Sequence, residues 1–465
     1  MLKLHNSYSN NIEEFKVDSE NVKIYLCGPT VQSSPHIGHG RSAVVFDFLI
    51  RYLRFIDYSV TFVRNITDID DKIIQRSHEE GITTNELAER VAAEFKNSYD
   101  ELNCLVPDYE PKATETIDHI IYFIELLIEK DFAYSTESGV YFEVKKFDNY
   151  LKLSGRNKEE VISGTRVDVE SDKKDIEDFA LWKISKDNEP SWKSPWGEGR
   201  PGWHIECSAM INKIFNGGID IHCGGNDLIF PHHENELAQS ACAFENKEFT
   251  KYWLHNGMIN LSGQKMSKSE GNIKLLNEYL DLYGGNIIRF FFLRSQYRKP
   301  QEFTEGLLEE SKTTFNRISE IVRDVESNPS ELSIIEMFKN SMNDDLNTPK
   351  FLGEVFEKIK TMKELSHQDE KKLKETIKYI FEVLGFNFEN IEQIEISNEK
   401  LNSFFNKFNI SYQNIDQAMD EYLIQREEFR KNKNFTEADT MRDQLKEIGI
   451  LIKDGEESGW YWEGR

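Results

Sequence analysis

The alternation of apolar and polar positions near the start of the chain predicts a buried strand and then a long helix. Val22, Ile24 and Leu26 form the apolar side of this strand, and Gly28 begins the turn that ends it. The dense apolar run that follows predicts a core helix that begins near Gly40. A strand, a tight turn and a helix in this order are typical of the first βα unit of a nucleotide-binding sheet.

A second alternating run predicts the next strand of the same sheet. Residues 58–64 alternate apolar and polar side chains and complete a βαβ unit as a parallel strand. This strand leads directly into the polar stretch 65–72, at the strand end where an α/β sheet holds its ligands. The same stretch is also typical of a capped helix start, with Thr67 or Asp68 as the N-cap residue, and both interpretations can hold.

The remaining pattern divides the rest of the chain into helical and irregular parts. Residues 83–130 have helical spacing with a break at two prolines, and residues 132–189 show no βαβ rhythm, which predicts an insertion. The run 190–207 is rich in Trp, Pro and Gly, so we expect an ordered loop without a regular element. From Leu307 onward helices dominate, and a small β-like cap is predicted at residues 449–462.

Composition narrows the class of protein. At 465 residues, with 38% hydrophobic and 12% aromatic residues, the chain is long enough for several packed domains. Its 57 Lys and Arg against 82 Asp and Glu give a net charge of −25, which argues against non-specific adhesion to nucleic acids or membrane surfaces. The sequence lacks an apolar run of membrane-spanning length and a signal-peptide core, so we expect a cytoplasmic protein with no membrane partner. Five irregularly spaced cysteines fit reduced thiols or a metal site better than disulfides.

Two motifs are suited to binding phosphate. His36-Ile-Gly38-His39 lies at the expected junction of the first strand and its helix, where the N–H groups of a helix N-terminus attract anions. The two imidazoles add donors, and Gly38 lets a ligand approach the backbone closely. The Lys-Met-Ser-Lys-Ser run that holds Lys265 and Lys268 is a cationic loop of small residues, which suits stabilisation of a polyphosphate during reaction. As isolated patterns, both motifs also occur as ordinary turns and exposed loops.

A metal site is predicted from residues that are far apart in the chain. His232 and Glu236 are four residues apart and therefore share one face of the predicted helix. Cys27, at the end of the first strand, and Cys207 complete a Cys, Cys, His, Glu set that suits Zn²⁺. Two alternatives remain open: His233 is the ligand in place of His232, or Cys207 is only a small core residue.

Together these motifs resemble a known family. The His-Ile-Gly-His and Lys-Met-Ser-Lys-Ser pair resembles the signature of class I aminoacyl-tRNA synthetases. Residues 65–72, 202–207 and 230–236 are similar to the cysteinyl-tRNA synthetase family, and the likeness covers essentially the whole chain. The resemblance implies an α/β fold: a Rossmann-like parallel-sheet catalytic domain with an insertion, then a helical bundle and a small C-terminal anticodon-binding domain. The expected boundaries are 1–130 and 190–262 for the two catalytic halves, 131–189 for the connective insertion, 263–306 for the Lys-Met-Ser-Lys-Ser loop and connecting segment, 307–400 for the bundle and 401–465 for the anticodon-binding domain.

The resemblance also implies a reaction and its partners. Members of this family activate cysteine with ATP to cysteinyl adenylate and transfer it to the 3′ end of tRNA(Cys). ATP with Mg²⁺ is the expected substrate, one Zn²⁺ per chain the expected cofactor, and a monomer the expected state. The implied zinc ligands are Cys27, Cys207, His232 and Glu236, and the implied cysteine pocket contains Cys27, Thr67, Trp203 and His232.

The resemblance assigns the remaining site residues in two groups. The implied catalytic residues are His36, His39, Lys265 and Lys268, and the implied ATP-binding residues are Gly38, Asp227 and Lys268. The implied anticodon contacts are Arg430, Phe435, Asp439 and Asp454, within a local basic cluster of Arg426, Arg430, Lys431 and Lys433. Phe435 stands where a tryptophan is common in the family, so it keeps a stacking ring but lacks the indole N–H. Without the resemblance, the basic cluster is equally typical of a solvated helix face.

Two other functions remain as alternatives. One is a related cysteine ligase that acts on a small amine and has no anticodon module, against which the helical region and the basic C-terminal cluster argue. The other is a catalytically inactive RNA-binding relative, against which both signature motifs and the four candidate zinc ligands argue.

Overall fold

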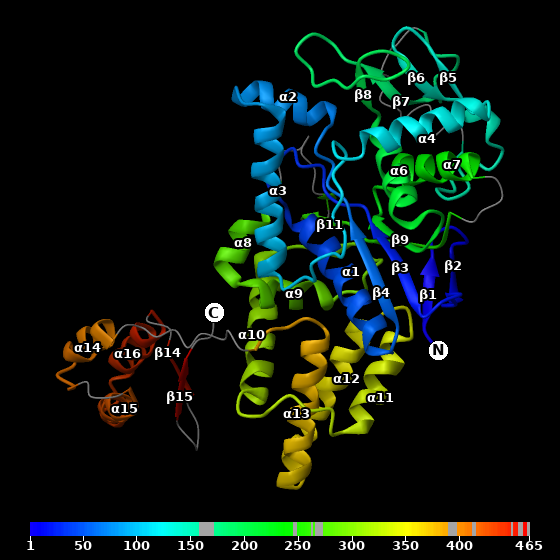
Figure 1. Cartoon of the computed structure of the whole chain (residues 1–465). Coiled ribbons are helices and arrows are strands. Elements are labelled where there is room, and N and C mark those ends of the chain that lie inside the picture. The colour runs from blue at the N-terminus through cyan, green and yellow to red at the C-terminus, as the bar shows by residue number, and fades with distance from the viewer. Residues whose placement is uncertain are drawn as a thin grey trace. The chain divides into compact units, whose positions relative to one another are not determined.

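A four-stranded parallel sheet organises the first part of the chain in the computed structural model (Figure 1). Its strands are β3 (Asn21–Leu26), β4 (Ser59–Arg64), β9 (Ile219–Gly225) and β10 (Thr250–Asn256), in the order β10-β9-β3-β4. The order reverses between β3 and β9, because the chain builds outward from these two strands in opposite directions. Ligands of open α/β sheets bind outside the carboxyl ends of the strands at such a switch point. The predicted α/β class with a Rossmann-like sheet is confirmed.

The structure describes residues 1–157, 172–244, 249–261, 264–265, 273–388, 398–411, 415–447, 450–453 and 459–462. It falls into two compact units, Met1–Phe315 with Ile321–Phe386 and Asn316–Glu320 with Asn387–Arg465. The finer six-part division expected from the sequence remains a prediction. None of the helices within the described ranges has the length and apolar content needed to cross a lipid bilayer.

Helix α1 (Ile37–Phe55) begins earlier than the pattern predicts, at Ile37 and not near Gly40. His36 is its N-cap residue: the His39 main-chain N–H donates to His36 Nδ1 at 3.4 Å, and the His36 N–H donates to His39 Nδ1 at 3.2 Å. This reciprocal capping satisfies two N–H groups at the helix start. Histidine is an uncommon cap, which is why the pattern alone placed the start too late.

An antiparallel sheet forms the insertion, as Figure 1 shows at the end of the parallel sheet where β4 leads to α2. Its strands follow the order β5 (Ala133–Ser135), β6 (Gly139–Phe142), β7 (Phe179–Ile184) and β8 (Gly199–Pro201). The prediction that residues 190–207 contain no regular element is wrong, because β8 and the start of α6 (Trp203–Phe215) lie within them. The Gly- and Pro-rich composition ends at Gly202, and the apolar spacing of a core helix begins directly after it.

The other elements of the first unit surround the parallel sheet. The predicted N-cap of the helix after β4 is also wrong, since Asp70 caps α2 by accepting from Lys72 N–H at 3.0 Å. The carboxylate of Asp68 instead accepts from Thr114 N–H at 3.0 Å. The remaining elements up to the loop after β10 are β1 (Lys3–Asn6), β2 (Asn11–Glu14), α2 (Asp71–Glu80), α3 (Thr84–Glu101), α4 (Ile117–Glu129) and α7 (Glu234–Ala243).

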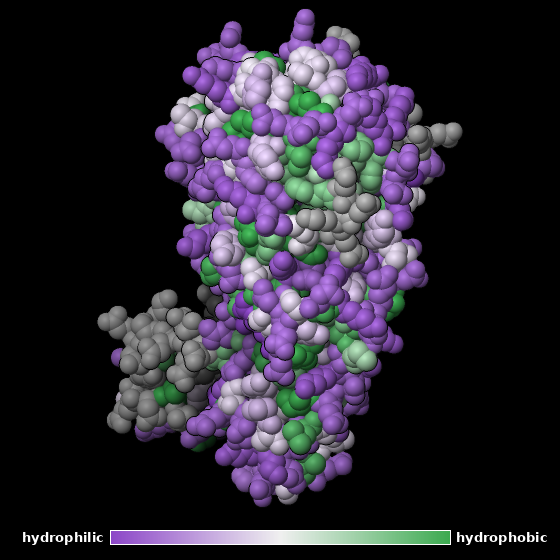
Figure 2. All heavy atoms as spheres, turned by 45° about the vertical axis from the view of Figure 1, so that its right-hand side comes forward, coloured by the Kyte–Doolittle hydropathy of each residue, from purple (hydrophilic) through white to green (hydrophobic). Residues whose placement is uncertain are grey.

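Helices dominate the chain after β10, as the pattern predicts. The short strands β11 (Ile259–Leu261), β12 (Gln264–Lys265) and β13 (Gln301–Glu302) form one small sheet. The helices that follow are α8 (Leu276–Tyr283), α9 (Gly285–Leu293), α10 (Glu305–Val322), α11 (Leu332–Met342), α12 (Thr348–Thr361) and α13 (His367–Val383). On the face that Figure 2 shows, hydrophobic residues lie in separate patches within a mostly hydrophilic surface.

The second unit has its own small core. Helices α14 (Asn398–Asn406), α15 (Ile415–Lys431) and α16 (Phe435–Glu447) pack beside the hairpin of β14 (Ile450–Lys453) and β15 (Gly459–Trp462). Phe405, Met419, Tyr422 and Leu445 are buried between them. The hairpin agrees with the β-like cap predicted from the sequence.

Candidate functional site

Four predicted metal ligands converge at the carboxyl end of the parallel sheet. Cys27 is the first residue after β3, and Cys207 lies inside α6. His232 belongs to the helical turn Ile229–His233, which leads into α7, and Glu236 lies in the first turn of α7. The site is therefore assembled from one strand end and two neighbouring helices.

The distances between the ligand atoms fit a tetrahedral zinc ion. The two cysteine sulfurs are 3.8 Å apart, Cys27 Sγ is 3.5 Å from Glu236 Oε1, and Cys207 Sγ is 3.6 Å from His232 Nε2. Zn–S bonds of about 2.3 Å and Zn–N or Zn–O bonds of about 2.0–2.1 Å would give about 3.8 Å and about 3.5 Å for these separations. His232 Nε2 and Glu236 Oε1 are 3.0 Å apart, slightly closer than the tetrahedral spacing. The donor set and its spacing both suit Zn²⁺.

Burial sets the protonation of these ligands. Glu236 is 0% exposed, Cys207 1% and His232 2%. Burial lowers the pKa of His232 to about 3, so the imidazole is neutral and its nitrogen can act as a ligand. Burial also raises the pKa of both thiols, Cys27 and Cys207, above the usual value. Because zinc binds the thiolate form of cysteine, metal binding at these two residues would release protons.

Neighbouring side chains hold the ligands in place. His222 Nε2 lies 2.9 Å from Glu236 Oε2, the oxygen that does not face the cysteines. His204 Nδ1 lies 3.0 Å from His232 Nδ1, and the Trp203 ring stacks on the His232 ring with centroids 4.3 Å apart. Such partners fix the orientation of metal ligands and raise their basicity.

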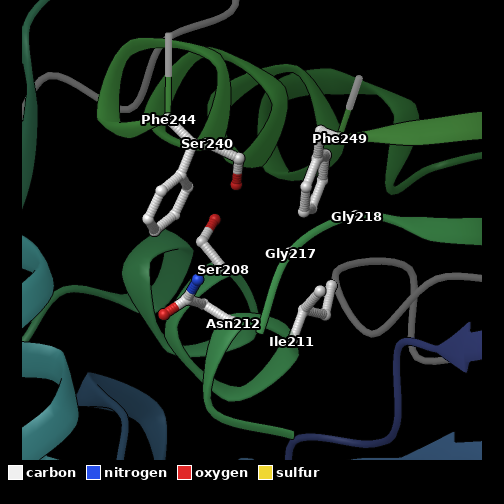
Figure 3. Close-up of a pocket in the computed structure, with 8 residues that line it drawn as sticks. All are labelled: Ser208, Ile211, Asn212, Gly217, Gly218, Ser240, Phe244 and Phe249. Atoms are coloured by element: carbon white, nitrogen blue, oxygen red, sulfur yellow. The ribbon is translucent and has the colours of Figure 1, made fainter. Parts of the chain in front are cut away.

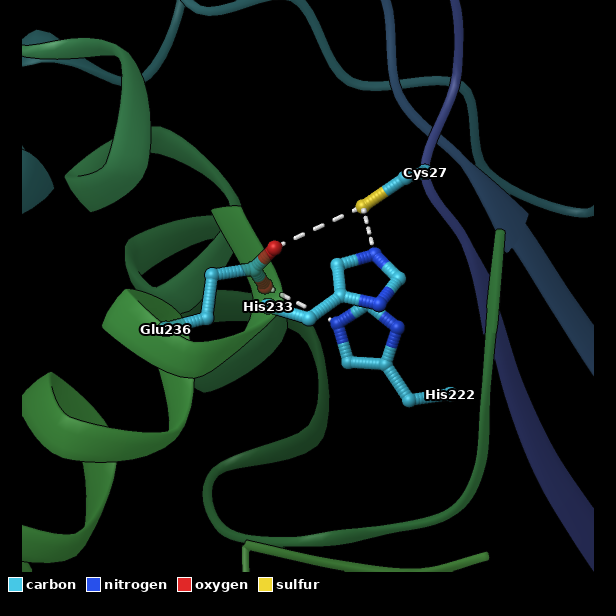
Figure 4. A group of neighbouring side chains, drawn as sticks. All are labelled: Cys27, His222, His233 and Glu236. Carbon is cyan, nitrogen blue, oxygen red and sulfur yellow. Dashed lines mark hydrogen bonds and ion pairs between the residues drawn. The ribbon is translucent and has the colours of Figure 1, made fainter. Parts of the chain in front are cut away.

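A second, overlapping ligand set keeps the alternative at His233 open. Figure 4 shows Cys27, His222, His233 and Glu236 pointing toward one another, and they are also close enough to hold a metal. His233 Nε2 is 3.3 Å from Cys27 Sγ, while its Nδ1 is 2.8 Å from His255 Nε2. The two sets share Cys27 and Glu236, so they describe one site. The set that includes Cys207 has two sulfurs and suits zinc better.

The sequence reasoning did not find the histidines around this site. His204, His222 and His255 all contact a candidate ligand or its neighbour. The sequence does hold a signal for His222, because this histidine stands in the apolar run of β9. In the structure it is fully buried. The chain has 11 histidines, and five of them gather around this site; the placement of His222 and His255 among them depends on the pairing of β9 with β10.

The predicted cysteine pocket lies beside the metal ligands. A Cβ atom at position 28 would lie 1.6 Å from the Asn65 carbonyl oxygen, so only glycine lets the ends of β3 and β4 come this close. Thr67 is buried, and its hydroxyl donates to Glu206 Oε2 at 3.1 Å and accepts from the Asn65 amide at 3.3 Å. Glu206 immediately precedes Cys207, so the helix that carries this candidate ligand also orients Thr67. The sequence reasoning missed Glu206.

The structure describes the histidine side of the predicted phosphate site but not the lysine side. The rings of His36 and His39 stack with centroids 3.6 Å apart at the N-terminus of α1, and Gly38 lies between them in the first turn. Asp227 is exposed in the turn after β9. The main chain of Lys265 ends β12, whereas its side chain and the whole of Lys268 lie outside the described residues.

Two pockets among the described residues are separate from the predicted site. The pocket in Figure 3 lies between α6 and α7 beside the start of β9 and has a volume of about 10 Å³, enough for one water at most. A larger pocket of about 380 Å³ lies beside the β1–β2 hairpin and the edge strand β10. Neither pocket is lined by a residue that the sequence assigned to substrate.

The predicted anticodon residues lie in the second unit. Phe435, the first residue of α16, is 58% exposed, and Arg430 lies in the last turn of α15. Asp439 is exposed and lies 3.3 Å from Arg442. Asp454 is outside the described residues. The inclusion of Arg426 in the basic cluster is wrong, because Arg426 is buried and its Nε donates to the Ala438 carbonyl at 3.0 Å.

Comparisons with family models cover most of the chain. Residues 13–313 match the class I (C) tRNA synthetase catalytic domain, residues 337–389 match the DALR domain, and residues 413–462 match the cysteinyl-tRNA ligase anticodon-binding domain.

Curated relatives and solved structures agree with these matches. The cysteine–tRNA ligase of Methanococcus maripaludis is 44% identical over 99% of this chain and 98% of its own length. That of Hydrogenovibrio crunogenus is 43% identical over 99% of both chains. Mycobacterium tuberculosis methionyl-tRNA synthetase with methionyl-adenylate has a similar fold, with a TM-score of 0.58 and 16% identity over 79% of this chain and 90% of that one. A putative arginyl-tRNA synthetase of Campylobacter jejuni has a TM-score of 0.54 and 16% identity over 79% and 94%.

Proposed function

This chain belongs to the cysteine–tRNA ligase family of class I tRNA synthetases, and from that premise we propose how its residues divide the work. It is a ligase that forms aminoacyl-tRNA from cysteine, ATP and tRNA. The family match over residues 413–462 argues against the small-amine ligase considered as an alternative, because such a ligase has no anticodon-binding domain.

In this proposal Cys27, Cys207, His232 and Glu236 would hold a zinc ion that distinguishes cysteine from serine. Serine differs from cysteine by one atom, and a pocket that recognises shape alone separates such substrates by only about 1–3 kcal/mol. When bound, zinc offers the substrate sulfur a direct bond that a neutral hydroxyl makes far less well. The observation that carries the proposal is the near-tetrahedral spacing of the two sulfurs, the imidazole nitrogen and the carboxylate oxygen.

The protein's own groups orient the amino acid around this centre. Trp203 stacks on His232, so its ring would shield that imidazole from water. The hydroxyl of Thr67 is fixed by Glu206 and Asn65 and lines the pocket in a single orientation. A pocket held in this way restricts where the cysteine carboxylate can lie before it attacks the α-phosphate of ATP.

ATP lies along the N-terminus of α1 in this proposal. The helix end and the rings of His36 and His39 supply donors for the phosphates, and Lys268 with Lys265 stabilises the charge that develops on them. Gly38 permits a close approach of the triphosphate, and Asp227 contacts the adenosine from the turn after β9. Mg²⁺ accompanies the nucleotide.

The second unit binds the tRNA anticodon. With a net charge of −25, the protein's overall field opposes tRNA, so binding must come from local cations and base contacts. Phe435 offers an exposed ring on which a base can stack, four residues after Lys431 and five after Arg430. Asp439 and Asp454 would accept hydrogen bonds from base edges. We also propose that the protein is cytoplasmic and acts as a monomer.

Zinc analysis with matched cysteine variants tests this assignment. Protein purified without chelator should contain one Zn²⁺ per chain, and Cys207→Ser should lose zinc and weaken cysteine binding far more than ATP binding. Cys242→Ser is the control, since Cys242 is also a buried thiol but lies at the other end of α7. The assignment fails if the purified protein lacks stoichiometric zinc, or if the two variants retain zinc equally.

A further inference from the structure

Helix α1 is bonded directly to the chain that follows the predicted Lys-Met-Ser-Lys-Ser run. The Ile37 N–H donates to the Lys274 carbonyl at 3.0 Å, and the Leu276 N–H donates to the Pro35 carbonyl at 2.9 Å. His36 and Leu275 form a β-bridge between them. The far flank of the run is thus held by main-chain bonds within one residue of the first signature histidine.

Arg41 joins the near flank of the run to α1, in addition to main-chain bonds such as that from the Gly257 N–H to the Tyr297 carbonyl at 2.8 Å. Arg41 lies five positions after His36 in α1 and is 0% exposed. Its NH1 donates to the carbonyls of Gly257 and Met258 at 2.9 and 2.8 Å, directly before β11, the strand that leads into the run. Its NH2 donates to the carbonyls of Gln296, Tyr297 and Lys299 at 3.5, 3.3 and 2.6 Å.

Arg41 therefore joins two loops to the signature helix. The loops are themselves in close contact, because a Cβ atom at position 257 would lie 2.3 Å from the Lys299 carbonyl oxygen. Just beyond the guanidinium they pair as parallel strands, with Ile259 opposite Gln301. The guanidinium is the shared donor of five carbonyl oxygens at the base of this small sheet.

The environment of Arg41 differs from that of an ordinary buried ion pair. No carboxylate within the described ranges forms a salt bridge with it, and carbonyl oxygens alone surround its two terminal nitrogens. Burial lowers the pKa of Arg41 to about 10, so the side chain still carries its charge at neutral pH. Burying a charge without a counter-ion costs folding free energy. An arginine kept at this position despite that cost indicates that the geometry it holds has a function.

We propose that Arg41 is a positioning residue for adenylate formation, which fixes the strand entering the Lys-Met-Ser-Lys-Ser run against the helix that carries His36 and His39. It sets the position of β11 relative to the start of α1 and does not contact substrate itself. This inference rests on the proposed roles of Lys265 and Lys268. A displacement of about 1 Å between reacting groups costs about 10²-fold in rate, so loosening this junction should reduce catalysis with little effect on binding.

Arg41→Lys tests the inference while keeping the charge. Lysine has three donors on one nitrogen and cannot serve five carbonyls that lie on two loops. We expect kcat for cysteine-dependent ATP–pyrophosphate exchange to fall by about 10²-fold. The KM for cysteine and the zinc content should stay within about twofold of the parent, because Arg41 does not contact the metal centre.

Arg289→Lys is the matched control. Arg289 is equally buried and also donates to main-chain carbonyls, at 2.7 Å to Leu384 and 2.8 Å to Leu102, but it meets α1 at Asp47, eight residues beyond His39, and within the described residues does not contact the loops around β11. It should lower thermal stability without a selective loss of exchange. Gly257→Ala adds a Cβ atom that crowds the Lys299 carbonyl at the same junction. It should cause the same selective fall in kcat, and so it tests the inference even if Arg41→Lys folds poorly.

The outcomes separate four cases. A selective fall in kcat for Arg41→Lys and Gly257→Ala, absent in Arg289→Lys, supports the positioning role. Parallel losses of kcat, cysteine KM and zinc in Arg41→Lys and Arg289→Lys would overturn it and leave a purely structural arginine. If Lys268→Ala reduces exchange while Arg41→Lys does not, the inference fails and the proposed function stands; normal exchange in Lys268→Ala would refute the premise instead.

Discussion

The candidate metal centre and the candidate anticodon surface differ in how far their side chains are fixed before any substrate arrives. At the metal centre, Cys207, His232 and Glu236 are almost fully buried, and each lies within hydrogen-bonding distance of another candidate ligand. In the second unit, Phe435 is 58% exposed and Asp439 is an exposed member of a local ion pair. The first arrangement suits a small substrate that must be distinguished by one atom, and the second suits a large polyanion.

This difference sets where selectivity originates. A buried, interlinked site meets its ordering cost during folding, so the substrate encounters groups that already have one orientation. An exposed surface orders its long side chains only on binding, and its ion pairs are screened by salt. Variants of the metal centre should therefore act on cysteine, and variants of the second unit should act on tRNA, with little cross-effect.

The largest effect should come from Cys27→Ser, which removes a sulfur shared by both candidate ligand sets. Removing a side chain that only supports a metal ligand costs about 10–100-fold in metal affinity, and removing a ligand itself should cost more. We expect cysteine-dependent pyrophosphate exchange to fall by more than about 10²-fold, with zinc lost and tRNA affinity unchanged. A variant with full zinc content and a normal cysteine KM would exclude Cys27 as a ligand.

Lys268→Ala should have the next largest effect. If its ammonium meets charge that develops on the phosphates, its removal should slow adenylate formation by about 10²–10³-fold with little change in cysteine affinity. Single-turnover measurement of adenylate formation tests this, with Lys265→Ala for comparison as the weaker of the two lysines. Normal exchange in Lys268→Ala would remove it from the catalytic residues.

His222→Phe should have an intermediate effect that sharpens the contrast. Phenylalanine preserves the stack on Trp253, whose centroid is 4.5 Å away, but cannot donate to Glu236. We expect zinc affinity to fall by about 10–100-fold, measured by competition with a chelator. The exposed His78 in α2 supplies the control His78→Phe. Equal zinc affinity in both variants would show that His222 does not support the centre.

The smallest effect should come from neutralising Arg430 and Lys431 together. Both lie in the last turn of α15, and removing each cation that meets a phosphate should reduce the salt dependence of tRNA binding by about one charge. The KM for tRNA should rise roughly tenfold and the salt dependence should fall, while tRNA-independent exchange stays normal. Lys358→Gln with Lys360→Gln, two exposed lysines of α12, makes the same change in charge elsewhere. If both double variants charged tRNA alike across a salt series, the α15 cluster would be only a solvated face.

Much of the fold could be predicted because local pattern determines it. The parallel strands at β3 and β4 and the long helix α1 follow from apolar spacing, and the family and its activity follow from motifs that keep their order. The start of α1 could not be predicted, because the two histidines cap it reciprocally. The helical position of Cys207 could not be predicted either, because α6 begins inside a stretch whose Gly, Pro and Trp content is typical of a loop.

The sequence predicts the candidate reactive residues of the site but not the residues that orient them. Motif residues such as His232 and Glu236 carry a spacing that sequence reveals, and the structure brings them together with Cys27 and Cys207; their role as ligands stays a prediction. His222, Glu206 and Arg41 act on other residues through interactions that depend on strand register and helix packing. The contacts of Glu206 and Arg41 join residues more than a hundred positions apart, and that of His222 joins a strand to the helix after the next turn. No local sequence pattern indicates such contacts.

The ligand order along the chain has a consequence during synthesis. Cys27 precedes Cys207 by 180 residues, and β9, which pairs with β3 in the middle of the sheet, is made after Cys207. At about 5–20 residues per second, Cys27 leaves the ribosome roughly 9–36 s before its partner sulfur does. Throughout that interval the nascent chain has half a sheet and only one of the two ligand thiols. Metal capture by the candidate set would therefore be a late event in synthesis, because its second thiol is still missing when the first strands form.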